Sequence, residues 1–261
     1  MHPFERSRPL PPYRAVLAVD AKGFTDMPGS THEDVAALIP RLVGDAMREA
    51  GLAAEWADPE FYGHTGDGFA MGLPTRILPY LVHPLPALLQ QRLETHGREH
   101  RGADPLRLRV SLHVGPLPAD SAAPGNGGNG PARNETHRLL DSDVVKRALA
   151  DASPRISLVA MIVSDRVFQD VVSAGYSGLH PDHFVDVIAR VEGKPFEQRA
   201  WLHLPAPSGS GLGAGGSSEP VNEPNSFVQH SPVPVPSVGI NHGQIAGIVH
   251  GGMHQSPRRP A

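Results

Sequence analysis

Two aspartates stand where a metal ion could bind. Asp20 follows residues 14–19, a short apolar run with β-branched content, and Asp67 lies in the polar turn of a hairpin expected over residues 60–73. Taken alone, Asp20 is ambiguous between a turn or helix cap and a metal ligand. A hairpin beside the first strand would bring the two carboxylates to one sheet edge. Hard oxygen ligands at that edge suit Mg²⁺ or Mn²⁺, which also bind substrate phosphates.

A second pair of polar residues lies further along the chain. Asn134 and Arg138 are four residues apart, so they share one face of a helix expected over residues 134–150. An amide and a guanidinium on one face can converge on a polyphosphate. Neither residue alone is informative, because surface Asn and Arg are common. His113, in the strand expected over residues 106–114, is interpreted as a packed or edge residue without a role.

Alternating strand-like and helix-like segments carry these residues. A 3.6-residue apolar period predicts a helix over residues 31–51, and the hairpin is followed by a second helix over residues 77–95, which its three prolines would delay or bend. Beyond the strand at 106–114 and the helix at 134–150, we expect a strand (157–163), a short helix (166–172) and a hairpin (184–191 with 196–204). This order predicts an α+β fold: a ferredoxin-like βαββαβ sheet with an extra helix and a C-terminal hairpin.

Composition narrows the class of protein. The 261 residues include no cysteine, which excludes disulfides, thiolate zinc sites and cysteine nucleophiles. The formal net charge of −4 supplies no basic field, so nucleic acid is not an expected partner. No apolar run is long enough to span a membrane, and residues 1–6 precede no apolar signal-peptide core. We therefore expect a cytoplasmic protein.

The amino-acid composition of the chain changes near residue 205. Residues 205–261 hold 19 Gly and Pro but only four charged side chains. The run PAPSGSGLGAGGSS has almost nothing that could pack in a core. We predict a globular domain over residues 1–204, a flexible linker over 205–225 and a tail over 226–261.

The order of the motifs resembles the catalytic domain of class III nucleotidyl (adenylate/guanylate) cyclases. YRAVLAVDAKGFTD is similar to the first-strand motif of that family, and GHTGDGFAMGLP is similar to its second-metal hairpin. LRLRVSLHVGPL resembles the strand that ends in His-x-Gly, and GPARNETHRLLDS resembles the helix that bears Asn-x-x-x-Arg. The resemblance covers about residues 13–204.

The resemblance implies a role for each matching residue. Asp20, Asp67 and the carbonyl of Ala21 would hold two Mg²⁺ or Mn²⁺ ions, one activating the ribose 3′-hydroxyl and one binding the triphosphate of a nucleoside triphosphate. Asn134 would orient the ribose, and Arg138 would stabilise charge on the phosphate. In this family the metal aspartates and the Asn/Arg pair come from different subunits, which implies a head-to-tail homodimer with two interfacial sites.

Three further residues belong to the same expected substrate site. Phe24 and Thr25 complete the Gly-Phe-Thr motif after the first aspartate. Lys194, in Glu-Gly-Lys, is a candidate phosphate contact, with an exposed hairpin lysine as the competing interpretation.

The chain departs from the family at the two positions that read the base. The purine-reading lysine would fall at Gly63, and the second base-reading position at Gly127. Both lack side chains, which argues against a plain adenylate or guanylate cyclase and leaves open a pyrimidine nucleotide, or a domain that binds nucleotide without cyclising it. Neighbouring residues that could substitute are Tyr62, His64, Asn126 and Asn129.

The tail contains a second pattern. Residues 238–255 read VGINHGQIAGIVHGGMHQ, with apolar residues set between Gly and His, Asn or Gln, and without charge or proline. Such a segment can stack as cross-β, and it resembles bacterial amyloid signalling (RHIM-like) motifs. A disordered tail is the competing interpretation. The residues expected to form the motif are Ile240, Asn241, His242, Gly243, Gln244, Ile245, Gly247, Ile248, Val249, His250 and Gly251.

Together these features predict a bacterial immunity effector. Its cyclase would convert a nucleoside triphosphate to a 3′,5′-cyclic nucleotide and pyrophosphate, and its tail would be templated by a nucleotide-binding receptor with a matching motif. The alternative is a catalytically inactive, cyclase-like adaptor that signals through the tail. A third interpretation is an ordinary cyclase whose tail has no role.

Overall fold

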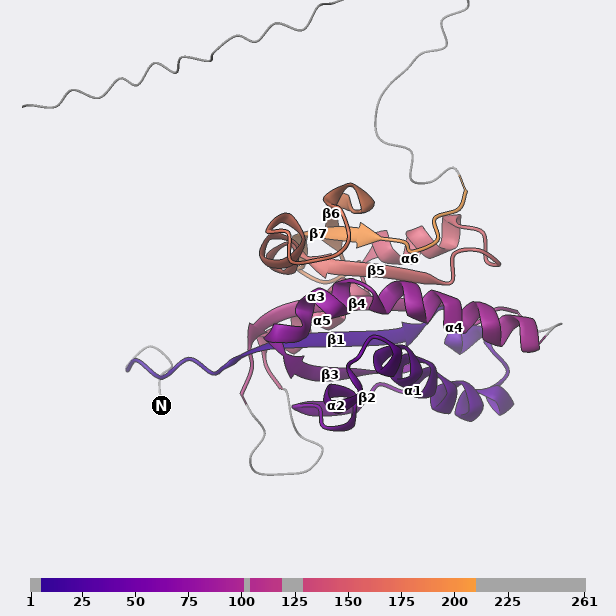
Figure 1. The fold of residues 1–261 in the computed structure, drawn as a ribbon, viewed down its shortest axis with the longest axis horizontal. Helices are drawn as coiled ribbons and strands as arrows, with labels where there is room; N and C mark the ends of the chain where they lie inside the picture. Colours follow the sequence, from indigo (N-terminus) through magenta and orange to yellow (C-terminus); the bar gives the residue numbers. More distant parts are fainter. Residues whose placement is uncertain (1–5, 101–103, 119–128, 210–261) are drawn as a thin grey trace, which may run out of the picture. The chain divides into compact units, whose positions relative to one another are not determined.

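The computed structural model describes residues 6–100, 104–118 and 129–209 (Figure 1). These residues form a seven-stranded mixed sheet of order β2-β3-β1-β4-β5-β7-β6. Adjacent strands are antiparallel except for β4 and β5, which are parallel. The strands are β1 (Tyr13–Ala21), β2 (Phe61–His64), β3 (Gly68–Pro74), β4 (Leu108–Pro116), β5 (Val159–Ser164), β6 (Val185–Arg190) and β7 (Glu197–His203).

Helices cover both faces of this sheet. On one face, three helices pack on a large apolar core: α1 (His32–Glu49), α3 (Leu78–Val82) and α4 (Leu85–Glu99). Two short helices contribute to the same core, α2 (Ala53–Ala57) and α7 (Asp165–Val167). On the other face lie α5 (Pro131–Leu140) and α6 (Asp143–Asp151). Single helical turns are η1 (Phe24–Asp26), η2 (Gly29–Thr31), η3 (Thr75–Ile77) and η5 (Pro181–His183), and η4 (Phe168–Ser173) is a π-helix.

The central strands are buried on both faces, so alternation assigns each side chain to one helical layer. In β1, Leu17 and Val19 face the layer of α1 and α4, whereas Val16 and Ala18 face α5. In β4, Leu108 and Val110 likewise join the core beneath α1 and α4. By the same alternation, Asp20 on β1 and Arg109 on β4 point to the α5 side of the sheet.

The predicted α+β fold is confirmed. The helix expected at 31–51 is α1, the hairpin at 60–73 is β2 and β3, and the strand at 106–114 is β4. The helix expected at 77–95 is instead two helices, α3 and α4, separated at the His83-Pro84 bond. Proline explains the break, because its ring removes a backbone donor and restricts the residue before it.

The helix expected at 134–150 also divides in two. Helix α5 ends at Leu140 and α6 begins at Asp143, with Ser142 in an extended conformation between them. The buried hydroxyl of Ser142 donates a 2.7 Å hydrogen bond to the Leu139 carbonyl, one of the carbonyl groups in the last turn of α5 that lack a partner within the helix. The short helix α2 was not expected from the sequence.

Several predictions concern residues outside the described part of the chain. The amyloid-like motif, Gly127 and most of the expected linker lie there, and the domain boundary at residue 204 stays a prediction. Within the described residues, none of the helices has the length and apolar character needed to cross a bilayer.

One glycine allows the β2–β3 hairpin to lie against the end of β1. Gly68 pairs with Asp20, and a Cβ atom at Gly68 would lie only 1.9 Å from the Val19 carbonyl oxygen. The adjoining turn is closed onto β1 by a 3.0 Å hydrogen bond from the Ala21 amide to the Asp67 carbonyl. The hairpin can therefore approach Asp20 only because residue 68 has no side chain.

We expect Gly68→Ala to lower the free energy of unfolding by at least about 2 kcal/mol, because the new methyl group meets backbone that cannot move aside. Urea unfolding monitored by circular dichroism measures the change. Gly29→Ala is the matched control, since a Cβ there meets nothing within 4 Å. Equal unfolding midpoints for the two variants would contradict this account of the hairpin.

Candidate active site

The hairpin turn brings Asp20 and Asp67 to the same sheet edge. Asp20 lies next to Ala21, whose amide donates to the backbone oxygen of Asp67. The two carboxylates are close enough that the charge of Asp67 contributes to raising the pKa of Asp20. The structure thus brings the backbone of Asp67 next to the end of β1, as the sequence predicted, and the two carboxylates lie within electrostatic range of each other.

The carboxylate of Asp20 is held by Arg109. Its two oxygens accept 2.7 Å hydrogen bonds from Nε and Nη2 of that guanidinium, and both side chains are largely buried. Burial raises the pKa of Asp20 to about 7; the charge and hydrogen bonds of Arg109 oppose this rise, and Asp67 and Asp141 add to it. A proton and the Arg109 guanidinium therefore compete for the Asp20 carboxylate.

Arg109 is a functional candidate that sequence reasoning missed. It stands directly opposite Asp20 in the register of β1 and β4. The available signal was a charged residue in a strand expected to be central, since a charge buried there needs a partner. Arg107, Ser111 and His113 occupy the same alternating polar positions, so residue type alone did not single out Arg109. What the sequence did not supply was the register that identifies Asp20 as that partner.

Helix α5 carries Asn134 and Arg138 and packs over β1 and β4. Two buried polar contacts fix it there: the Ser111 hydroxyl donates to the Thr136 carbonyl at 2.9 Å, and His113 Nε2 lies 3.1 Å from the Glu135 carboxylate. Burial lowers the pKa of His113, and Glu135 opposes the shift. His113, to which the sequence assigned no role, therefore helps to position the helix.

Among the described residues, neither Asn134 nor Arg138 makes a hydrogen bond or ion pair with Asp20 or Asp67. Helix α5 nevertheless lies near both aspartates: the charge of Asp67 opposes the lowering of the His137 pKa by burial, and that of Asp141 adds to the rise that burial causes in the pKa of Asp20. Asn134 is exposed, and the Arg138 guanidinium lies over the ring of Phe196, 5.7 Å from its centroid. In the structure the hydrogen bonds and ion pairs of Asp20 are with Arg109. The predicted site residues therefore form two groups, with the carboxylates in one and the Asn/Arg pair in the other.

The remaining predicted substrate residues are placed as follows. Phe24 and Thr25 lie in η1, with the Phe24 ring stacked on His32 at a centroid distance of 4.3 Å and Thr25 exposed. Lys194 is exposed in the turn between β6 and β7, with Nζ 3.7 Å from a carboxylate oxygen of Asp141. None of these contacts joins Lys194 to the aspartate pair.

Arg133 fills the space above Gly63. A Cβ atom at Gly63 would lie 2.8 Å from one Nη atom of Arg133, whose guanidinium carbon is 5.5 Å from the centroid of the Phe61 ring. The strand position that lacks a side chain is thus occupied by a cation from α5, one residue before Asn134. Sequence reasoning missed Arg133, because its proximity to Gly63 depends on how α5 crosses the sheet.

No protein-family model and no curated protein matches the sequence. The structure is similar to the solved structure of the guanylyl cyclase Cya2, with 15% sequence identity and a TM-score of 0.51, over 77% of this chain and 95% of that one. It is also similar to a bacterial light-regulated adenylyl cyclase, with 12% identity and a TM-score of 0.50, over 80% of this chain and 56% of that one. The domain has the class III nucleotidyl cyclase fold.

At these identities the similarity concerns the fold of the cyclase-like domain. The chemistry has to be argued from its own residues. The donor set at the β1 edge is compatible with the two metal ions that this fold typically uses, because Asp20 and Asp67 are hard oxygen donors whose mutual repulsion a cation would relieve.

A double-mutant cycle tests the buried ion pair. We expect Asp20→Ala alone to destabilise the domain by about 3 kcal/mol or more, because it leaves the buried Arg109 guanidinium without its partner. Arg109→Ala should destabilise it less, because a carboxyl whose pKa is already about 7 can take up a proton. The double variant should be less destabilised than the sum, which urea unfolding can measure. The exposed pair Arg190 and Glu197 on the β6–β7 hairpin is the control and should show far weaker coupling. Additive effects at Asp20 and Arg109 would contradict the pairing.

Proposed function

We propose that the domain is a nucleotidyl cyclase that converts a nucleoside triphosphate to a 3′,5′-cyclic nucleotide and pyrophosphate. The observation that carries the proposal is the meeting of Asp20 and Asp67 at one sheet edge of a cyclase fold. In the reaction the ribose 3′-oxygen loses its proton and attacks the α-phosphorus. The bond from that phosphorus to the bridging oxygen breaks, and pyrophosphate leaves.

The residues at the C-terminal end of β1 and in the adjoining β2–β3 turn would hold the metal ions. Asp20, Asp67 and the Ala21 carbonyl are the donors, and two Mg²⁺ or Mn²⁺ ions bound there would supply activation of the 3′-hydroxyl and neutralisation of phosphate charge. Arg109 donates to both oxygens of Asp20, so these two residues would share the site with any bound ion. The fork of N–H donors of Arg109 would also suit a phosphate group of the substrate.

The second group of residues would come from another copy of the chain. Asn134 and Arg138 lie on α5, and the hydrogen-bond partner of the Asp20 carboxylate in the same chain is Arg109. A head-to-tail homodimer would set them opposite the aspartates, where Asn134 orients the ribose and Arg138 stabilises charge on the phosphate. The placement of Arg133 beside Gly63 supports Arg133 as the side chain facing the base. As an N–H donor alone, it would favour a base edge that presents acceptors.

The second candidate function is an inactive adaptor. Two observations favour it: the Gly63 position carries no side chain of its own, and Arg109 already neutralises Asp20. In that case the domain binds nucleotide or a partner without chemistry, and the tail transmits the signal.

Incubation with Mn²⁺ and each of ATP, GTP, CTP and UTP, followed by mass spectrometry, separates the two functions. We expect one cyclic nucleotide from the wild type and at least a 100-fold lower yield from Asp67→Ala, because a carboxylate donor to the metal is lost. Asp182→Ala removes an exposed carboxylate from η5 and should retain activity. Absence of product from both wild type and control, including after fibre assembly, would favour the adaptor.

The proposal extends to the tail as an assembly element. The uncharged Gly/His/Gln/Ile pattern of residues 238–255 supports homotypic stacking, and stacking would concentrate cyclase domains so that dimeric sites form. A nucleotide-binding receptor with a matching motif would start the process, as expected of a bacterial immunity effector.

Deletion of residues 238–255 should abolish fibre formation and leave the melting temperature of the domain unchanged, because the described core is built from residues 15–204. Thioflavin fluorescence and electron microscopy detect the fibres, and calorimetry reports the fold. A full-length variant with residues 238–255 in shuffled order controls for composition. Fibres that still form after the deletion would contradict the assembly role proposed for residues 238–255.

A further inference from the structure

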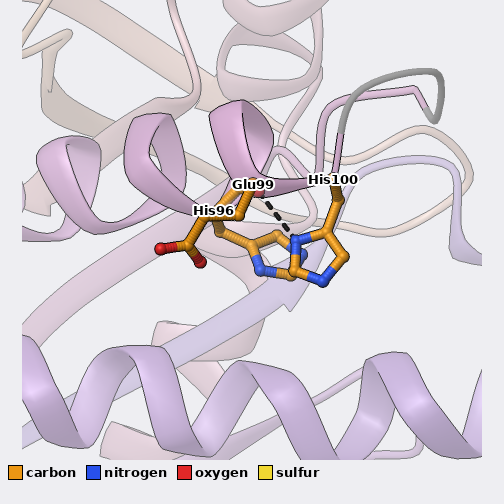
Figure 2. A group of neighbouring side chains, drawn as sticks. All are labelled: His96, Glu99 and His100. Atoms are coloured by element: carbon orange, nitrogen blue, oxygen red, sulfur yellow. Dashed lines mark hydrogen bonds between the residues drawn. The ribbon is translucent and has the colours of Figure 1, made fainter.

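Three potential metal ligands gather at the C-terminal end of α4, on the opposite side of the sheet from α5. They are His96, Glu99 and His100, shown in Figure 2. One ligand atom from each lies within 4.8 Å of the others. The two imidazole rings are 4.1 Å apart at their centroids and inclined by 32°. Among the described residues, this is the group of histidines and carboxylates whose geometry could hold a metal ion.

The helix itself creates this arrangement. Residues three and four apart share a face, so His96, Glu99 and His100 project from the last turn in one direction. His96 is half-buried, whereas Glu99 and His100 are exposed. Exposed side chains can change rotamer at little cost. The ligand atoms could therefore draw in to the ~3.4 Å separation that a tetrahedral ion with ~2.05 Å bonds requires.

A backbone hydrogen bond determines the protonation of one ligand. His100 Nδ1 lies 2.9 Å from the His96 carbonyl oxygen, and because a carbonyl can only accept, Nδ1 must carry the proton. The lone pair of the neutral imidazole is then on Nε2, which Figure 2 shows on the side of the ring away from His96 and Glu99. Binding through His100 therefore requires its exposed ring to turn and give up this hydrogen bond.

Neighbouring charges act on His96 with opposite signs, while burial and His100 also lower its pKa. The guanidinium of Arg41, from the adjoining helix α1, acts on His96 and opposes a cation. The Glu99 carboxylate acts on the same imidazole with the opposite sign. A bound divalent ion would therefore depend on Glu99 as a charged ligand and not only on the two imidazoles.

The donor types select the class of metal. Two imidazole nitrogens and one carboxylate suit Zn²⁺, Ni²⁺ or Cu²⁺, whereas Mg²⁺ prefers oxygen ligands. Three protein ligands would leave a fourth position for water. This chemistry differs from that of the all-oxygen donor set at Asp20 and Asp67.

We propose that His96, Glu99 and His100 form a binding site for a borderline transition-metal ion, with Zn²⁺ as its most suitable occupant. The ion joins His96, within α4, to His100 at its C-cap and so fastens the last turn of the helix. Because it binds the folded helix and not an extended chain, it stabilises the folded state. The site is separate from the proposed catalytic one and does not require catalysis.

Calorimetric titration of the full-length protein with ZnCl₂ tests the site. The tail contains further histidines, so the decisive quantity is the difference between variants that share that tail. We expect His96→Gln/His100→Gln to bind one Zn²⁺ fewer than the wild type, and Glu99→Gln to bind that ion at least about tenfold more weakly. His180→Gln, which removes an exposed histidine from another part of the domain, should bind as the wild type does.

Thermal unfolding supplies a second measurement. Zn²⁺ should raise the melting temperature of the wild type and of His180→Gln more than that of His96→Gln/His100→Gln, and Mg²⁺ should not reproduce the difference. Circular dichroism establishes that each variant is folded. Equal Zn²⁺ stoichiometry in the double variant and the wild type would overturn the proposal. Neither measurement involves nucleotide, so the result is independent of cyclase activity.

Discussion

The cost of placing the Asp20 carboxylate on a buried central strand constrains the structure around it. An unpaired carboxylate there would be strongly destabilising, and the bidentate guanidinium of Arg109 offsets that cost across one strand pair. Pairing requires β4 beside β1 in one register. The approach of Asp67 requires Gly68 on the other side of β1, where no side chain would fit. The strand order β3-β1-β4 is therefore also the order that assembles the candidate site.

Many of the helices and strands could be predicted from the sequence, because the spacing of apolar residues within one element is a local signal. The apolar period of α1 and the alternating run of β4 predicted those elements close to their observed bounds, and the aspartates were correctly expected at one edge. Helix breaks were harder to locate. A long apolar period continued through residues 134–150, whereas Ser142 ends α5 through a hydrogen bond to its last turn. A serine that caps and one that merely faces solvent look alike in a sequence.

Long-range contacts account for what the sequence did not predict. Arg109 was read as one more residue of a strand, since its meaning depends on the residue opposite. Gly63 was read as an empty position, yet the guanidinium of Arg133 fills the space beside it from α5, a helix 70 residues away in the chain. In both cases the residue type was visible and its partner was not. A missing side chain on one element therefore does not imply a missing group in the site, because another element can supply it.

The shared fold indicates where the candidate site residues lie, but it does not establish what each of them does. At 15% identity, a shared sheet order leaves the polar groups of the site free to change, so the chemistry has to follow from the groups present. Burial of Asp20 costs stability, and apolar residues would pack the same space at lower cost, so the carboxylate is kept either for the proposed chemistry or for fixing the register of β1 and β4. The two hydrogen bonds from Arg109 stabilise the buried carboxylate, and in the proposed enzyme a metal ion would have to compete with them for the same oxygens.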